Sequence, residues 1–126
     1  MKTSCFSIAG NNKNGVAICQ YPPSYYAGRI YRALAPSVDL LRAYKIGWVS
    51  QESFVTRYRE ETLSKLSAQR VFDDLGNSAI LLCHEKPGEF CHRRIVAKWL
   101  ESELSIEVPE LQRNQTNQGD ITKWLK

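Results

Sequence analysis

Apolar residues follow two different periods along the chain, and the change between them marks its centre. Residues 79–82 form an unbroken apolar run after the turn signal at residues 76–78, which predicts a short strand buried on both faces. From Phe90 onward the apolar residues recur at helical spacing, at Cys91, Ile95, Val96, Trp99 and Leu100. A buried strand is therefore predicted to lead, through a loop broken at Lys86-Pro87-Gly88, into an amphipathic helix.

Two shorter strands are predicted at the start of the chain, at residues 2–8 and 16–19. The loop between them, residues 9–15, is rich in Asn and Gly. So short a loop favours a hairpin, and a parallel pair joined by a displaced connection stays open as the alternative.

Three helices are expected next, each beginning after a serine that can accept from free backbone N–H groups. These serines are Ser37, Ser50 and Ser67. Gly47 and Gly76 are expected to end the first and third helices. The order of elements indicates an α/β fold: a small three-layer sandwich with a short, mostly parallel central sheet flanked by helices.

The end of the chain completes a single domain spanning residues 1–126. Residues 106–108 are predicted to form a last strand, because an apolar pair precedes Pro109. Residues 111–119 are polar and predict a flexible connector, and residues 120–126 predict a short helical turn.

Charge and cysteine content narrow the class of protein. The 126 residues carry 17 Lys and Arg against 13 Asp and Glu, a net charge of +4 that suits anionic ligands but is low for a DNA-coating protein. No apolar run approaches the roughly 20 residues of a membrane span, and residues 1–10 lack a signal-peptide core. We therefore expect a cytoplasmic protein whose four cysteines are free thiols or ligands.

The junction at residues 83–94 concentrates the chemistry. It holds Cys83-His84 and Cys91-His92, followed by Arg93. In open α/β sheets, ligands bind beyond the carboxyl ends of strands, where helix N-termini offer free N–H groups. Arg93 is well placed for a bidentate grip on phosphate or carboxylate. This pattern predicts an anion site.

Thiol and metal chemistry compete with anion binding. Cys91 lies near a predicted helix N-terminus beside His and Arg, a setting that tends to depress a thiol pKa, and Cys83 could face it across the loop. A closed four-ligand metal site is awkward, because adjacent strand residues point to opposite faces and adjacent helix residues diverge by about 100°. We therefore predict no resident metal or other cofactor, and a three-ligand site using both cysteines and one histidine stays open.

Residues 21–36 are rich in tyrosine and proline, with Arg29 and Arg32 interleaved. The tyrosines can simply cover the core while their hydroxyls stay wet. Alternatively, they form a platform that stacks a base beside basic residues, which makes Tyr25 and Arg29 candidate ligand contacts.

The stretch L-L-C-H-E-K-P-G-E-F-C-H-R-R-I-V-A-K-W-L resembles the signature of the domain-of-unknown-function 488 (DUF488) family, which includes YeaO-like small α/β proteins. The segments S-I-A-G, Y-P-P-S-Y-Y-A-G, L-A-P-S and F-V-T-R-Y-R-E-E-T-L-S-K-L are similar too. The resemblance implies a compact α/β sandwich and no assigned activity. It carries over six positions: Cys83, Glu85, Lys86, Cys91, His92 and Arg93. Many relatives have an arginine after the second strand where this chain has residues 18–20, so either Arg29 replaces it or the ligand differs.

The leading hypothesis is a domain that binds a phosphate-bearing small molecule, a nucleotide or nucleoside derivative, at the loop from Cys83 to Cys91. The candidate catalytic residues are Cys91, His92 and Glu85, and the candidate ligand contacts are Cys83, Lys86, Arg93, Arg29 and Tyr25. The alternatives are a nucleic-acid-binding accessory protein that uses the Tyr- and Arg-rich loop, and a thiol- or metal-dependent enzyme. No membrane partner is expected, and the sequence leaves oligomeric state and catalysis open.

Overall fold

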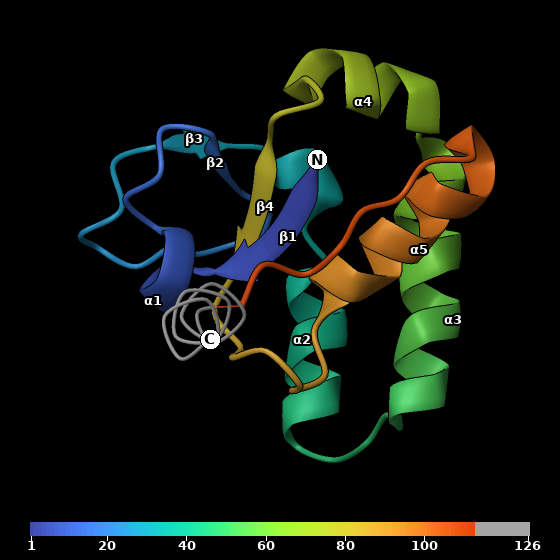
Figure 1. The fold of residues 1–126 in the computed structure, drawn as a ribbon. Coiled ribbons are helices and arrows are strands. Elements are labelled where there is room, and N and C mark those ends of the chain that lie inside the picture. Colours follow the sequence, from blue (N-terminus) through green and yellow to red (C-terminus); the bar gives the residue numbers. More distant parts are fainter. Residues whose placement is uncertain (113–126) are drawn as a thin grey trace, which may run out of the picture.

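A parallel sheet forms the centre of the structure, a computed structural model that describes residues 1–112 (Figure 1). Its strands are β1 (Lys2–Cys5), β2 (Gly15–Ala17), β3 (Arg29–Ile30) and β4 (Ile80–Cys83), in the order β1-β4-β2-β3. Every pairing is parallel. Because β4 lies between β1 and β2, all four of its residues are buried. The predicted α/β fold and the doubly buried strand are confirmed.

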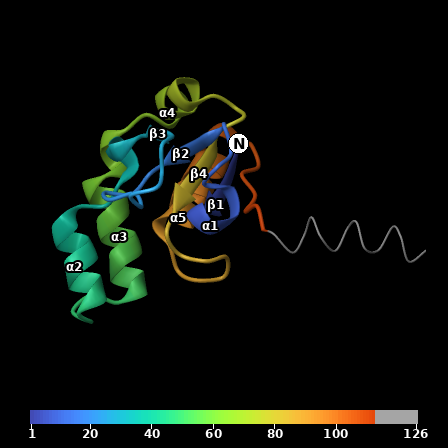
Figure 2. The same cartoon turned by 90° about the vertical axis from the view of Figure 1, so that its left-hand side faces the viewer.

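Helices cover the two faces of the sheet unequally (Figure 2). The helices of the described residues are α1 (Phe6–Ala9), α2 (Val38–Lys45), α3 (Gln51–Glu61), α4 (Ala68–Leu75) and α5 (His92–Leu104), with 3-10 turns at Arg32–Leu34 and Leu63–Lys65. Leu81 packs into the core formed by α2 to α5, whereas Leu82 packs into a smaller cluster with α1. One face therefore carries a thick helical layer, and the other carries a thin one.

Serine caps begin three of the helices as predicted. Each of these serines accepts a hydrogen bond from the backbone N–H three residues later. The distances are 3.1, 3.1 and 3.2 Å for Ser37, Ser50 and Ser67. Gly76, with φ of +88°, lies in the left-handed region at the end of α4. Within residues 1–112, no helix is long and apolar enough to cross a membrane.

The start of the chain differs from the prediction in two ways. Residues 6–8 were predicted as strand, and they belong to α1. The hairpin is also wrong, because β1 and β2 are parallel and β4 is inserted between them. The chain must leave β1 and cross over before it enters β2, and α1 provides that crossover (Figure 1). The parallel alternative is the correct one.

The last strand pairing in the described residues lies further along the chain than predicted. Residues 106–108 form no strand; instead Glu110 makes a parallel bridge to Thr3 of β1. The N–H of Thr3 donates to the carbonyl of Pro109 at 3.0 Å, and the N–H of Leu111 donates to the carbonyl of Thr3 at 2.7 Å. The flexible connector predicted at residues 111–119 is thus wrong for Leu111, which pairs with Thr3. The rest of it from residue 113 onward, and the turn predicted at residues 120–126, lie outside the described residues.

Candidate functional site

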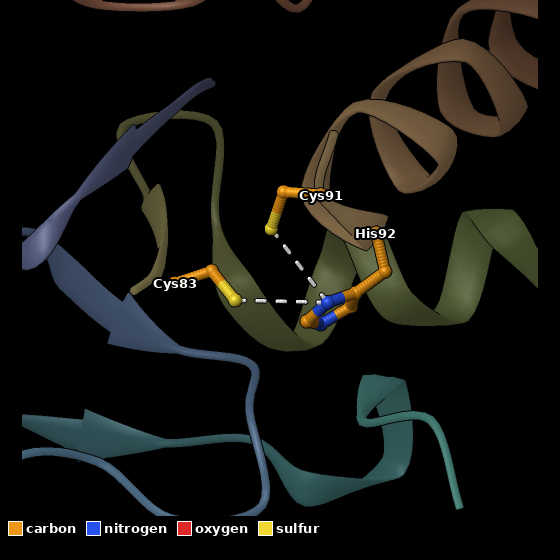
Figure 3. Close-up of side chains that lie close together, drawn as sticks. All are labelled: Cys83, Cys91 and His92. Atoms are coloured by element: carbon orange, nitrogen blue, oxygen red, sulfur yellow. Dashed lines mark hydrogen bonds between the residues drawn. The ribbon is translucent and has the colours of Figure 1, made fainter. Parts of the chain in front are cut away.

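Two thiols and one imidazole converge where β4 ends and α5 begins (Figure 3). Cys83 is the last residue of β4, Cys91 is the N-cap residue of α5, and His92 is its first residue. The Sγ atoms of Cys83 and Cys91 lie 3.6 and 3.8 Å from Nδ1 of His92. All three potential ligand atoms lie within 4.8 Å of one another. We call Cys83, Cys91 and His92 the Cys–His cluster.

The hydrogen bond on the far side of the ring fixes the tautomer of His92. Its Nε2 lies 2.7 Å from the carbonyl oxygen of Ile18, which can only accept, so Nε2 carries the proton. Nδ1 therefore presents a lone pair to the two sulfurs. The Tyr58 ring and the imidazole pack in a T-shaped arrangement with 5.6 Å between centroids, and the Tyr58 hydroxyl donates to the Leu34 carbonyl at 2.5 Å. The ring is thus held from two sides.

A hydrogen bond and burial together determine the protonation of Cys91. Cys83, Cys91 and His92 are only 3, 4 and 5% exposed. The hydrogen bond with Cys83 and then burial raise the pKa of Cys91 well above its usual range. The sequence predicted a depressed pKa from the helix N-terminus, and the structure indicates the opposite. Cys91, at the start of α5, is buried and lies beside a second thiol, and both features disfavour its charged form. Without a cation beside it, Cys91 is protonated at neutral pH.

Two adjoining cavities reach the cluster. The first, about 190 Å³, has walls of Tyr44, Phe54 and Phe90 and reaches Cys91 and His92. The second, about 150 Å³, is lined by Gln20, Tyr21 and Pro36 and reaches Cys83 and His92. Four residues line both cavities: Leu41, Lys45, Glu85 and His92. The cluster therefore lies where an aromatic and a more polar compartment meet.

A third cavity, about 220 Å³, adjoins Phe90 and Cys91. Its lining includes three cations, Arg59, Arg94 and Lys98. The guanidinium of Arg94 is already bonded through Nη1 to the Thr3 hydroxyl and the Val108 carbonyl, at 2.8 and 2.9 Å. Cys91 alone of the Cys–His cluster is part of this lining.

Arg93 turns away from the two cavities and into the protein. Its side chain is fully buried, and its Nη2 and Nε atoms bond the carboxylate of Glu110 at 2.7 to 3.2 Å. Burial lowers the pKa of Arg93, but the bonds to Glu110 and the nearby thiols raise it by more. The structure thus gives Arg93 a carboxylate from this chain as its anion. Its Nη1 has no hydrogen-bond partner among the described residues.

The other predicted site residues separate into two groups. Glu85 joins the cluster: it lines both cavities, and its Oε1 lies 3.6 Å from the sulfur of Cys83. Lys86 and Tyr25 are exposed and line none of the cavities described above. Arg29 donates to the carbonyls of Asp74 and Leu75 at the end of α4, at 3.0 and 3.2 Å. The structure brings Cys83, Glu85, Cys91 and His92 together and leaves the other four apart.

Several residues around the cluster were not among the predicted site residues. Tyr44, Phe54 and Phe90 build the aromatic walls, and their ring centroids lie 5.3 to 5.4 Å apart. Tyr58 and the carbonyl of Ile18 hold His92. Periodicity marks Tyr44, Phe54 and Tyr58 as helix positions but does not show which helix faces the junction. Lys45, which lines both cavities, was not among the predicted site residues either.

The chain matches the model of a known protein family. The model of the active DUF488-N3 subclade, DUF488-N3a, matches residues 14–104, well over half of the chain. The match spans β2 to α5 and contains the whole Cys–His cluster. No curated protein and no solved structure matches the chain. The chain belongs to the DUF488 family, as its junction motif suggested.

Proposed function

We propose that this protein binds a small molecule of the nucleotide or nucleoside class in the two cavities, and that its chemistry takes place at the Cys–His cluster. The observation that carries the proposal is the position of the cluster, at the meeting point of the aromatic and polar compartments. Together the two cavities reach the lower end, about 300 Å³, of the range typical of small-molecule sites.

The aromatic compartment suits a planar ring. Tyr44 and Phe90 are half-buried, so their rings are in part available to a ligand, whereas Phe54 is buried behind them. Stacking of a base on an aromatic side chain contributes roughly 1–3 kcal/mol and requires no particular base. This favours a ring-bearing ligand without selecting one base.

The second compartment suits the polar part of such a ligand. Gln20 and Tyr21 contribute polar atoms to its lining, and Lys45 stands where the compartments meet. An exposed ammonium at the mouth of a site is suited to a phosphate or carboxylate group. Lys45 thus takes the role that the sequence suggested for Arg93, whose charge is balanced by Glu110.

The reacting groups lie beside both compartments. Glu85 and His92 line each cavity, and Cys91 and Cys83 line one each. Glu85 is the group suited to proton transfer, since a carboxylate beside the ligand can take up or give a proton. His92 holds the sulfurs in place instead, because its Nε2 is bonded to the carbonyl of Ile18 and its Nδ1 faces Cys83 and Cys91. The matching family model is described as that of an active subclade, which agrees with a site that performs chemistry.

Ligand titration with Lys45→Ala and Phe90→Leu tests the proposal. We expect nucleotides or nucleosides to raise the melting temperature of the native protein. Lys45→Ala should weaken a phosphorylated ligand about tenfold, equivalent to about 1.4 kcal/mol, and leave the unphosphorylated nucleoside unchanged. Phe90→Leu should weaken both, because it removes the ring but keeps an apolar wall. Isothermal titration calorimetry measures each affinity.

Arg42→Ala is the matched control, since Arg42 is an exposed cation on the same helix that lines neither cavity. It should leave both affinities unchanged. If no nucleotide or nucleoside stabilises the native protein, or if Arg42→Ala weakens binding as much as Lys45→Ala, the proposal is wrong.

A further inference from the structure

The geometry points to a zinc ion held by Cys83, Cys91 and His92, with a fourth position open to the cavities. This inference goes beyond ligand binding and does not depend on it.

Two of the three donor separations are those of a tetrahedral zinc site. Zinc lies about 2.3 Å from sulfur and about 2.0–2.1 Å from imidazole nitrogen, which places sulfur about 3.6 Å from nitrogen at a tetrahedral angle. In the structure the two sulfurs lie 3.6 and 3.8 Å from Nδ1 of His92. The two sulfurs lie within 4.8 Å of each other, whereas two thiolates on one tetrahedral zinc lie about 3.8 Å apart. One ion can therefore contact all three atoms once the sulfurs approach each other by up to about 1 Å.

The imidazole is prepared as a ligand. Because Nε2 donates to the carbonyl of Ile18 at 2.7 Å, the lone pair is on Nδ1, the atom that faces both sulfurs. Metal-bound histidines usually donate their second ring nitrogen in this way, to a backbone carbonyl or carboxylate. Tyr58 packs against the same ring in a T-shaped arrangement and supports its orientation.

The chemistry of the donor atoms selects the metal. Without a metal, the thiol of Cys83 can donate to the carboxylate of Glu85 at 3.6 Å, and that of Cys91 can donate to Nδ1 of His92 at 3.8 Å. A metal ion would replace the two thiol protons and take the lone pair of Nδ1 and both sulfurs together. A set of two sulfurs and one nitrogen favours zinc over Mg²⁺ and Ca²⁺, which prefer oxygen ligands.

The fourth position distinguishes a catalytic from a structural zinc. Structural sites are closed by four protein ligands, whereas catalytic sites have three and leave one position for water or substrate. Among the described residues, the group of three Cys and His residues is not extended by a fourth. Both cavities reach His92, and Glu85 lines each of them close to Cys83. The open position is thus one that a ligand in the cavities can reach.

Metal analysis of the purified full chain tests this inference without any nucleotide. After loading with zinc and gel filtration, we expect close to one zinc per chain by mass spectrometry. X-ray absorption of that protein should give two sulfurs at about 2.3 Å and two lighter atoms at about 2.0–2.1 Å. Cys83→Ser, Cys91→Ser and His92→Ala should each lower the zinc content at least tenfold.

Cys19→Ser is the control, since Cys19 is a buried thiol that lines the second cavity but is not part of the cluster. It should retain zinc. Because a cluster variant can lose zinc by failing to fold, the absorption spectrum of the unaltered protein decides the ligand set. A zinc-free protein after loading, a shell with no sulfur, equal loss in Cys19→Ser, or a Cys83–Cys91 disulfide in the protein purified without added oxidant would each overturn the inference. Failure of nucleotide binding in zinc-loaded protein would count against the proposed function alone.

Discussion

Glu110→Ala is expected to lower the free energy of unfolding by about 3–5 kcal/mol. Arg93 is fully buried, and Glu110 is the partner of its Nε and Nη2 atoms. Removing the carboxylate leaves a charge in the core with nothing to balance it. Thr3 also loses a bond, since its hydroxyl donates to Oε1 of Glu110 at 2.5 Å. The midpoint of urea unfolding, followed by circular dichroism, measures the loss.

Arg70→Ala provides the comparison. Arg70 pairs with Asp74 at 3.6 Å on the surface, where its side chain is 79% exposed. Exposed pairs of this kind contribute about 0–1 kcal/mol, so the variant should unfold close to the native midpoint. Equal losses in the two variants would show that the Arg93–Glu110 pair contributes no more than a surface contact.

The same pair predicts a response to acid. Burial raises the pKa of Glu110, but the bonds from Arg93 and Thr3 lower it by more, so the pKa is below its ordinary value of 4.5. A carboxyl whose pKa is lowered by folding stabilises the protein above its unfolded pKa, and this stabilisation is lost as the pH falls. The difference between the native protein and Glu110→Ala should therefore be constant near neutrality and shrink below about pH 4.5.

Leu81→Ala is expected to cost about 4–5 kcal/mol, and Leu82→Ala about 2–3 kcal/mol, although both side chains are fully buried. The cost of a Leu→Ala change depends on how far the surroundings can collapse into the space. Leu81 faces the layer formed by α2 to α5, in which the helices pack against one another and resist collapse into a cavity. Leu82 faces the cluster under the single turn of α1, which can shift inward. Urea unfolding of both variants measures the difference.

Ile46→Ala controls for the loss of apolar surface as such, because Ile46 is 54% exposed at the end of α2. It should be nearly neutral. A cost for Leu82→Ala as large as that for Leu81→Ala would show that the thin layer is as rigid as the thick one.

Local signals were sufficient for most of the fold. Serine caps and apolar stripes predicted α2, α3, α4 and α5, because capping and burial depend on residues close in the sequence. The order of strands is set by pairing between distant residues, which no local pattern reports. For this reason the insertion of β4 between β1 and β2 was not predicted. β3 was also missed. Its two residues are exposed, so no apolar pattern marks them as a strand, and they are recognised as one only through their pairing with β2.

The site was predicted in composition but not in electrostatics. The density of Cys and His at the junction identified Cys83, Cys91 and His92 as neighbours, and the structure confirms that they meet. The ion pair of Arg93 was not predicted, because its partner, Glu110, is 17 residues further along the chain. Likewise, the pKa of Cys91 depends on Cys83 across the loop and on burial, neither of which follows from its place at the start of α5.

The pairing of Thr3 with Glu110 has a practical consequence for anyone who trims this protein. The family match runs from residue 14 to residue 104, so a fragment cut at those limits would lack both β1 and the carboxylate that neutralises Arg93. Without β1, one edge of the apolar strand β4 would have unpaired backbone N–H and C=O groups. Such an edge can pair with other molecules, which is a recognised route to aggregation. Boundaries for recombinant work should therefore include the first five residues and extend past Leu111.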